Sequence, residues 1–285
     1  MASLKEVKGR IATVTNTRKI TSAMKMVASS KLYKAQEAIT HMLPYEQRQH
    51  NLLDHLLGND DVLIWNSIRE VKRVALVVFS SNTSLCGAFN ANVIKQALTW
   101  LEEHKGLGEE NVLIFAIGKK VSEALLRRGY TLQGNFEGMA NRPSFSDAST
   151  LAQSLMDMFV SGKVDQITFI YNHFKSMASQ ILTREVYLPM QTSGNATDNI
   201  KETDYILEPS RQELLAMLLP KVLRLKLYTV LLDSNASEHA SRAMAMQIAT
   251  DNADDLLQKL TLMYNKTRQQ AITSELLDIV GGSMF

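Results

Sequence analysis

"RIATVTNTRKITSAMKMVASSKLYKAQEAITHML", residues 10–43, contains neither glycine nor proline. The same pattern runs on past Pro44 to Gly58, and a second uninterrupted stretch lies between Pro220 and Gly281. Glycine and proline are the strongest local breakers of helices. The sequence therefore predicts two very long helices, one near each end.

Each predicted helix is too long for a compact body. About 57 residues at ~1.5 Å each give roughly 85 Å, and residues 221–280 give about 90 Å. A compact chain of 285 residues has a radius of gyration of only about 19 Å. We therefore expect part of each helix to project, with the two apolar stripes buried against each other.

The first helix carries such a stripe. Its apolar residues, three and four apart as in coiled coils, are Leu4, Val7, Ile11, Val14, Ala28, Leu32, Ala35, Ile39 and Met42. Between Val14 and Ala28 the same phase falls on polar residues. These polar residues are Arg18, Thr21 and Lys25, and the apolar residues in another phase are Ile20, Met24 and Val27. The change of phase predicts that the helix changes neighbour or that the coil unwinds locally.

The last helix has a similar stripe, followed by a second set. The stripe consists of Met246, Ala249, Ala253, Leu256, Leu260 and Met263, and the later apolar set is Ile272, Leu276 and Ile279. The later set has no register partner in the predicted coil. We expect it to contact something other than the first helix.

Residues 71–190 have a different pattern, in which short apolar runs alternate with helical segments. The predicted strands are 74–81, 111–118, 165–174 and 180–190, and the predicted helices are 90–104, 119–128 and 147–160. This alternation is typical of an α/β domain with a largely parallel sheet, and the last strand reads as an edge strand. The polar stretch 192–204 is predicted to be a surface loop. The predicted divisions are 1–57, 58–207 and 208–285.

Composition excludes several classes of protein. The formal net charge is only +2, which gives no strong case for nucleic acid. Cys86 is the only cysteine, so a disulfide framework and a cysteine-rich metal cluster are excluded, and a reducing compartment fits best. No apolar run approaches the ~20 residues of a membrane span. Charged residues from Lys5 to Lys8 argue against a signal peptide.

Motifs for independent chemistry are missing. The stretch "SSNTSLCGAFN" (80–90) follows the first strand but has one glycine and no phosphate-loop lysine. The stretch "IGKK" (117–120) could hold an anion at a helix start, although a plain strand-to-helix turn is favoured. His50 and His55 lie five apart, a poor spacing for a shared metal on one helical face. No catalytic residue, cofactor site or metal site is predicted.

Two alternatives remain open from these residues. One is a stand-alone α/β enzyme with helical arms. The other is a coiled coil that binds nucleic acid, because the first forty residues hold eight Lys or Arg against two acids. Arg18, Lys19 and Lys25 wrap around the helix instead of forming one stripe, which weakens that second alternative.

Both ends of the chain resemble one family. The stretch "IATVTNTRKITSAMKMVASSKLYKAQ" (11–36) resembles the N-terminal helix of the gamma subunits of F-type ATP synthases. The stretch "ASEHASRAMAMQIATDNADDLLQKLTLMYNKTRQQAITSELLDIVGG" (236–282) resembles their C-terminal helix, and "SLCGAFN" (84–90) a motif of their central domain. The resemblance covers the whole length in order. Ser283, where the family usually has alanine, and "NTS" (82–84) depart from the pattern outside the shaft.

The resemblance implies a non-catalytic rotor. The terminal helices would form an antiparallel coiled coil inside a ring of three alpha and three beta subunits, around a central Rossmann-like domain that binds no nucleotide. The foot would sit on the membrane c ring with the epsilon subunit, peripheral to the cytoplasmic face of a bacterial cell membrane. No cofactor, nucleic acid or membrane insertion is implied. The flow of ions through the c ring would be coupled by rotation to ATP synthesis or hydrolysis. The transported ion is expected to be the proton.

The family's contact positions carry over onto this sequence. Those facing the alpha/beta ring are Met24, Lys25, Arg242, Gln269, Thr273 and Glu275. The segment facing the c ring and epsilon matches "DYILEP" (204–209), which gives Tyr205 and Glu208. Flexible and small side chains such as Met24 would make few directional bonds with the ring, as a rotating bearing requires. The nearby cations would meet acids on the catalytic subunits, and asymmetric contacts would make the three catalytic sites differ.

Overall fold

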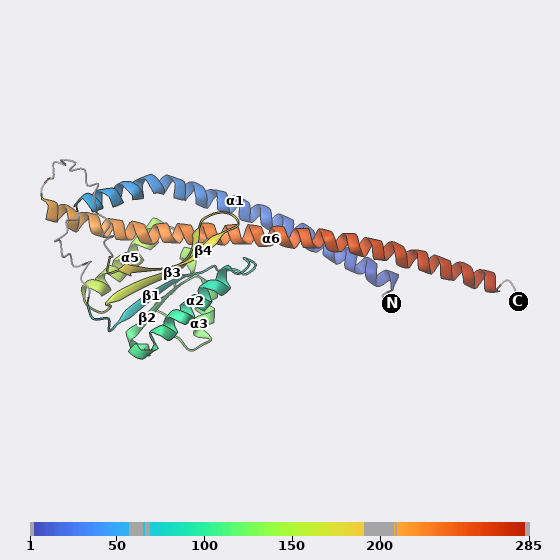
Figure 1. The fold of residues 1–285 in the computed structure, drawn as a ribbon, viewed down its shortest axis with the longest axis horizontal. Coiled ribbons are helices and arrows are strands. Elements are labelled where there is room, and N and C mark those ends of the chain that lie inside the picture. The colour runs from blue at the N-terminus through green and yellow to red at the C-terminus, as the bar shows by residue number, and fades with distance from the viewer. Residues whose placement is uncertain (1–2, 57–64, 66–68, 191–207, 209, 283–285) are drawn as a thin grey trace, which may run out of the picture. The chain divides into compact units, whose positions relative to one another are not determined.

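The computed structural model describes residues 3–56, 65, 69–190, 208 and 210–282. Its elements are α1 (Leu4–Leu56), β1 (Val74–Phe79), α2 (Phe89–Glu103), β2 (Val112–Ile117), α3 (Lys119–Leu126), α4 (Glu137–Asn141), α5 (Phe145–Val160), β3 (Gln166–Phe174), β4 (Gln180–Leu188) and α6 (Arg211–Gly282), with 3-10 turns at Lys105–Leu107 and Glu109–Asn111 (Figure 1). Residues group into two compact units. The coil unit contains residues 1–29 and 242–285, and the α/β unit contains residues 30–241.

The two terminal helices are as long as the absence of breakers predicts. α1 has 53 residues and α6 has 72, which correspond to about 80 Å and 108 Å of helix. Each contains one proline, Pro44 in α1 and Pro220 in α6. A proline removes one backbone hydrogen bond, and the sequence prediction began the second helix after Pro220 for that reason. In the structure α6 begins ten residues before Lys221, at Arg211.

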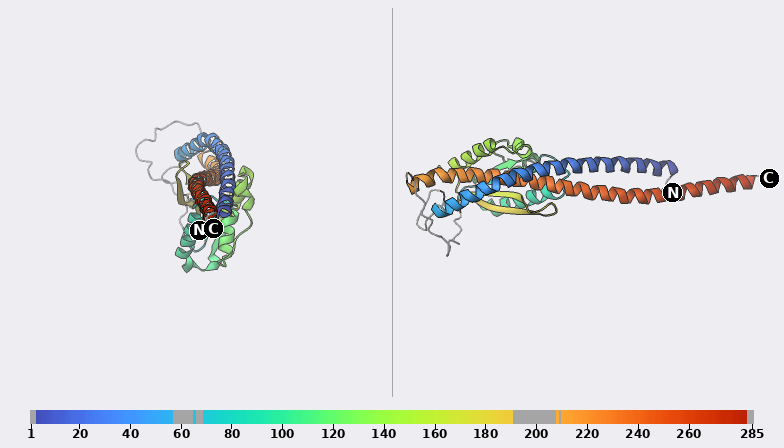
Figure 2. Two further views of the ribbon diagram at one scale, coloured as in Figure 1. Left: turned by 90° about the vertical axis from the view of Figure 1, so that its right-hand side faces the viewer. Right: turned by 90° about the horizontal axis from the view of Figure 1, so that it is seen from above.

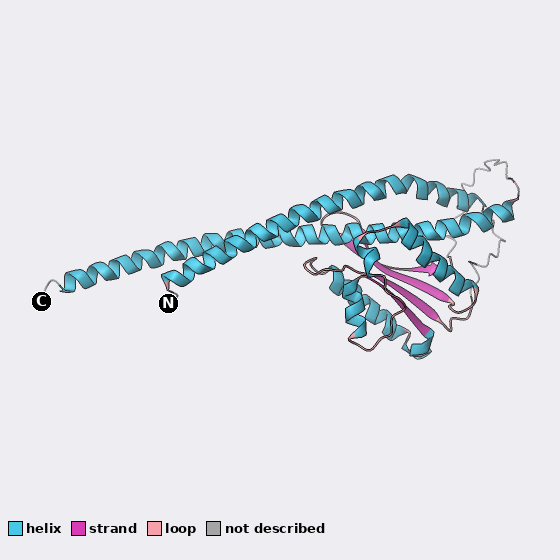
Figure 3. Cartoon of the chain, turned by 180° about the vertical axis from the view of Figure 1, so that it is seen from behind, coloured by secondary structure: helices cyan, strands magenta, loops and turns pink. Residues whose placement is uncertain are grey.

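The α/β unit is built on one mixed sheet in the order β2-β1-β3-β4. β1 pairs in parallel with β2 and β3, with Val74 opposite Val112 and Gln166. β4 pairs antiparallel with β3 and forms an edge, as its alternating sequence predicts. The strands are shown as magenta arrows in Figure 3.

Alternate residues of β1 serve opposite faces of the sheet, which is why its whole sequence is apolar. Val77 and Phe79 belong to a cluster with α5 and α6, whereas Leu76 and Val78 belong to a cluster with α2 and α3. Every residue from Val74 to Phe79 is at most 1% exposed. Such burial is worth about 1.5–3 kcal/mol for each large apolar side chain.

α6 is anchored to the α/β unit by polar contacts as well as by apolar packing. Asp233 accepts hydrogen bonds from the Phe174 N–H, at 2.7 Å, and from His173 Nδ1, at 2.5 Å. Asn235 Nδ2 donates to the Ala140 carbonyl at 2.9 Å, and Ser241 Oγ donates to the Cys86 carbonyl at 2.8 Å. These contacts fix α6 against the end of β3, against α4 and against the loop that follows β1.

Within the described residues, no helix combines the length and the apolar character that a membrane crossing needs.

Candidate functional site

The coil unit pairs the beginning of α1 with the end of α6 (Figure 2). Thr21 Oγ1 lies 2.8 Å from Thr250 Oγ1, and Arg18 Nη1 lies 2.8 Å from Asp254 Oδ1. Residue numbers rise on one helix as they fall on the other, so the helices are antiparallel. In this register Leu4 is level with about residue 267, because each helix rises equally per residue.

The seam of α1 continues through its polar positions without a change of phase. Val7, Thr21 and Ala28 are 1%, 9% and 2% exposed, and Arg18 and Lys25 are half-buried in the same three-four phase. Ile20 and Val27, the apolar residues of the other phase, are 60% and 58% exposed and lie outside the seam. The change of phase therefore marks a second apolar surface and not a local unwinding of the coil, because polar side chains occupy the seam positions here.

The residues that form the seam on α6 also differ in part from the predicted stripe. Met246, Ala253 and Leu260 are buried as expected. Leu256 and Met263 are 45% and 52% exposed, and their neighbours Leu257 and Tyr264 are the half-buried residues. Thr250, and not Ala249, makes the cross-helix contact. Adjacent apolar residues made the two phases hard to distinguish in the sequence.

Several large apolar residues of the coil unit are exposed outside the seam. They are Ile20, Met26, Val27, Met244, Ile248, Leu256, Leu262 and Met263. Met24 and Lys25, two predicted contact residues, are half-buried. Exposed apolar side chains in this number are the surface that a partner of the coil unit would cover.

The end of α6 extends past the position level with Leu4. All residues from 268 to 280 are exposed, including Ile272, Leu276 and Ile279 at 45%, 57% and 69%. The predicted contact residues Gln269, Thr273 and Glu275 lie on this stretch, where Thr273 Oγ1 donates to the Gln269 carbonyl at 2.9 Å. No residue in the described part of α1 lies level with these exposed apolar side chains.

The remaining predicted residues lie elsewhere. Arg242 is only 9% exposed, at the boundary between the two units. Glu208 is exposed and precedes α6 by three residues. Tyr205 lies outside the described residues. The sequence prediction did not name Thr250 or Asp254, because their partners Thr21 and Arg18 lie more than 200 positions away in the sequence.

In the α/β unit, the backbone amides that a phosphate would need are used internally. At the start of α3 the Lys119 N–H donates to Asn82 Oδ1 at 2.8 Å, and the Val121 N–H donates to Ser80 Oγ at 3.1 Å. A Cβ on Gly118 would lie 2.2 Å from the Ser80 carbonyl oxygen. The protein's own side chains therefore cap the helix start that could otherwise bind an anion.

Cys86 is a packed residue in this loop. Its thiol is 2% exposed and accepts a hydrogen bond from Asn90 Nδ2 at 3.1 Å. Asn90 also accepts from the Ser81 N–H at 3.0 Å, so the pair ties the loop after β1 to α2. This arrangement explains the motif "SLCGAFN" as a structural element.

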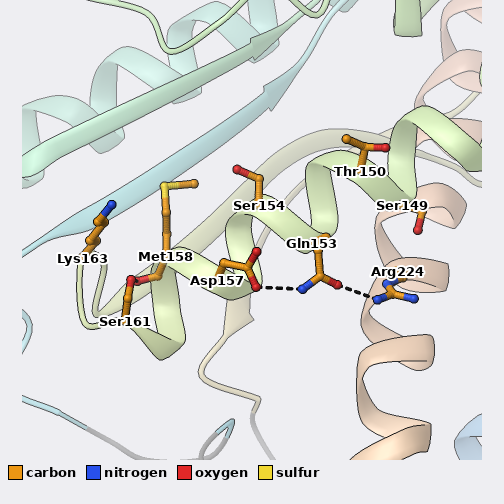
Figure 4. Close-up of a pocket in the computed structure, with 9 residues that line it drawn as sticks. All are labelled: Ser149, Thr150, Gln153, Ser154, Asp157, Met158, Ser161, Lys163 and Arg224. Atoms are coloured by element: carbon orange, nitrogen blue, oxygen red, sulfur yellow. Dashed lines mark hydrogen bonds between the residues drawn. The ribbon is translucent and has the colours of Figure 1, made fainter.

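A hollow of about 780 Å³ lies on the surface of the α/β unit beside α5 and α6. Asp157, Gln153 and Arg224 point toward one another there, with contacts of 2.7 Å and 2.5 Å (Figure 4). The other lining residues are Ser149, Thr150, Ser154, Met158, Ser161 and Lys163. The carboxylate already accepts a hydrogen bond from Gln153, and the lining contains no histidine or cysteine. The hollow therefore lacks a nucleophile paired with a base.

No group of three or more His, Cys, Asp or Glu residues that could hold a metal ion is found in the described parts of the chain.

Comparison with known proteins gives one consistent family. The model of the ATP synthase family matches residues 3–284. The chain is 59% identical to the ATP synthase gamma chain of Phocaeicola vulgatus and 56% identical to that of Bacteroides thetaiotaomicron, with 100% of each chain covered.

Solved structures share the fold. A chain of the Euglena gracilis mitochondrial ATP synthase, solved with OSCP, F1 and c-ring, has a TM-score of 0.66 at 20% identity. The match covers 99% of this chain and 93% of that one. A chain of the central stalk and c-ring of the Tetrahymena thermophila enzyme has a TM-score of 0.58 at 22% identity, with 81% and 99% covered. Long terminal helices around an α/β domain, and sequence identity over the whole length, place the protein in the ATP synthase gamma chain family.

Proposed function

We propose that the protein is the central-stalk rotor of a proton-translocating F-type ATP synthase. It couples ion flow through a membrane c ring to ATP synthesis or hydrolysis in a ring of three alpha and three beta subunits. It performs no catalysis itself. Full-length identity to gamma chains is the observation that carries this proposal.

The coil unit supports the role of a shaft. Its seam joins two helices, while its outward face and the end of α6 present apolar side chains that make few directional bonds. Such a surface can turn within a sleeve without strong preference for one orientation. We assign the contacts with the ring to Met24, Lys25, Arg242, Gln269, Thr273 and Glu275.

The foot of the stalk is assigned to the segment that precedes α6 in the sequence. We assign contacts with the c ring and the epsilon subunit to Tyr205 and Glu208. The protein would then be a peripheral part of the membrane complex on the cytoplasmic face. The division into a first helix (1–57), a central domain (58–207) and a last helix (208–285) belongs to the same proposal.

The α/β unit would position the shaft and not bind nucleotide. The amides at the start of α3 already have acceptors in Asn82 and Ser80. This property disfavours the alternative of a stand-alone nucleotide-dependent enzyme.

Co-expression with the alpha and beta subunits of the same organism tests the proposal. The chain should elute with both subunits as one complex, and ATP hydrolysis by that complex should exceed that of alpha and beta without the chain. Adding membranes stripped of their peripheral sector should then restore ATP-driven proton pumping. Elution of the chain by itself, with alpha and beta equally active without it, would refute the proposal.

A further inference from the structure

The seam of the coil unit contains a polar layer between apolar layers. Thr21 is 9% exposed and faces Thr250 across the seam. One turn away, Arg18 pairs with Asp254 at 2.8 Å, with both side chains about half exposed. The two contacts therefore combine a buried hydroxyl pair with a more exposed ion pair.

The two hydroxyl groups can always make a bond between the helices. Thr21 Oγ1 also lies 3.0 Å from the Arg18 carbonyl, and Thr250 Oγ1 lies 2.8 Å from the Met246 carbonyl. Two hydroxyl hydrogens are available for these three contacts. Whichever threonine donates to its own helix, the other can donate across the seam, so the cross-helix bond persists in both arrangements.

The apolar layers of the coil unit do not by themselves choose one axial offset, although Leu32 and Ala35 pack with Ala236 and Ala240 at this same offset in the α/β unit. Coiled-coil packing repeats every seven residues, or about 10 Å of helix. A slide of one repeat would put Thr21 level with Leu257 or, in the other direction, with Ala243. Neither side chain can hydrogen-bond. The same slide would separate Arg18 from Asp254, whereas apolar residues such as Val7 would still meet apolar residues.

We propose that Arg18, Thr21, Thr250 and Asp254 form a register lock, which holds the two helices of the coil unit at one axial offset. The inference rests on the proposed function, since a rotor shaft must twist as one body if it is to transmit torque. These four are positioning residues. Polar residues at single seam positions are the best-attested means of fixing register in coiled coils.

Disulfide trapping in the full-length chain tests the lock directly. In a Cys86→Ser background, cysteines at Val14 and Leu257 report the native register. Cysteines at Val14 and Tyr264 report a slide in one direction, and cysteines at Ile11 and Ala253 report the opposite slide. The ratio of the shifted to the native cross-linking rate measures slippage even where the shifted state is rare.

Thr21→Val with Thr250→Val should raise this ratio roughly ten-fold, because the cross-helix hydrogen bond is lost. The matched control is Thr17→Val with Thr261→Val, since both of these exposed hydroxyls bond only to carbonyls of their own helix. The control should leave the ratio unchanged. An equal ratio in the lock variant, the control and the parent chain would overturn the proposal.

The ion pair offers a second test that does not remove a buried group. Arg18→Glu should raise the ratio, and adding Asp254→Arg should restore the parent value. Arg10→Glu is the control, because Arg10 pairs within α1 with Glu6. Circular dichroism confirms that each variant stays helical. Failure of the charge swap to restore the ratio would overturn the contribution of the ion pair.

Measurements on the assembled enzyme distinguish a failure of the register lock from a failure of the proposed function. Lock variants should assemble with alpha and beta but pump fewer protons per ATP hydrolysed than the control variants. If the parent chain does not assemble, the proposed function fails, while the trapping ratio still decides whether the lock exists. A further outcome is a variant that has a raised cross-linking ratio and still pumps the parent number of protons per ATP hydrolysed. That result would show that a fixed register of the two helices is not needed to transmit torque, and would overturn that part of the inference.

Discussion

The two units of the molecule use apolar residues in opposite ways. In the α/β unit, apolar residues of β1 are at most 1% exposed, and both faces of the sheet are covered by helices. In the coil unit, large apolar residues such as Ile20, Leu262 and Ile279 are more than half exposed. The core of the sheet is therefore closed within the α/β unit, whereas the coil unit presents apolar side chains that a partner would cover.

The same helix shows both behaviours along its length. Within the α/β unit, α6 buries Leu223, Leu227 and Ala236, and it is anchored through Asp233. Beyond Leu260 none of its described residues is buried. Helical continuity thus joins a folded anchor to a contact surface. Changes in the two regions should consequently affect different measurements.

The largest effect on stability should come from Phe169→Ala. This residue is 0% exposed, stacks on Tyr187 at 4.3 Å and meets Phe79 edge-on at 5.7 Å. Its truncation should cost about 3–5 kcal/mol because it leaves a cavity in the core. Urea unfolding followed by the fluorescence of buried Trp100 measures this loss.

Leu262→Ala is the matched change in the coil unit, because Leu262 is 71% exposed. It should alter the stability of the isolated chain by less than about 0.5 kcal/mol. Similar losses for both variants would show that the two units do not differ in the way proposed.

Removal of residues 272–285 should weaken assembly with partner subunits and leave the stability of the α/β unit unchanged. The α/β unit should unfold at the same urea concentration as in the full chain, because Ile272, Leu276 and Ile279 are exposed and belong to the other unit. Assembly with alpha and beta should weaken roughly ten-fold or more, since three large apolar side chains would lose burial against the ring. Sedimentation or gel filtration of the complex measures this. A truncated chain whose α/β unit unfolds would contradict the shaft assignment.

The sequence predicted the α/β unit more accurately than the coil. Each of the four strands was placed to within two residues, because apolar runs such as "VALVVF" are bounded by turn residues. The edge position of β4 followed from its alternation. The short helix α4 was missed, because five residues are too few to show a helical period.

The coil seam was harder to predict for a physical reason. Hydropathy identifies seam residues only when they are apolar, whereas Arg18 and Thr21 find polar partners on α6. Those partners lie more than 200 positions away in the sequence, so no local pattern reveals them. For the same reason the sequence could not show that the seam continues through Arg18 and Thr21 while Ile20 and Val27 lie outside it.

Met24→Lys tests the proposed contact between the coil unit and the alpha/beta ring. We expect an effect of intermediate size on rotation. Methionine makes no directional bond, but an ammonium group there would find an acid or a carbonyl on a neighbouring subunit. A hydrogen bond to a charged group is worth about 1.5–3 kcal/mol. Formed in one rotary position and lost in the next, it should slow rotation roughly ten- to a hundred-fold or uncouple it.

The measurement is proton pumping per ATP hydrolysed in membrane vesicles. Met24→Leu conserves volume and apolar character, so it should be nearly silent. Wild-type pumping and rate in the Lys variant would mean that Met24 does not face the ring.

The smallest expected effect concerns the anchor of α6 in the α/β unit. Burial raises the pKa of Asp233, although hydrogen bonds from Phe174 and His173 and the charge of Lys226 oppose this rise. The folded state therefore retains the proton to higher pH than the unfolded state does. The contribution of this group to stability is fully present below the pKa of an unfolded aspartate, near 3.9, and declines as pH rises through the raised folded pKa.

Asp233→Asn removes this titration while preserving shape and an acceptor for the Phe174 N–H. The unfolding free energy of the parent relative to that of the variant should therefore fall as the pH rises above the pKa of an unfolded aspartate, about 3.9, by less than about 1.5 kcal/mol. His173→Gln, measured in parallel, separates the contribution of the His173 hydrogen bond from that of the carboxyl group. Urea unfolding at a series of pH values provides the measurement. A relative stability that rises with pH would mean that hydrogen bonds and the Lys226 charge outweigh burial, so that Asp233 anchors α6 as a stabilised carboxylate.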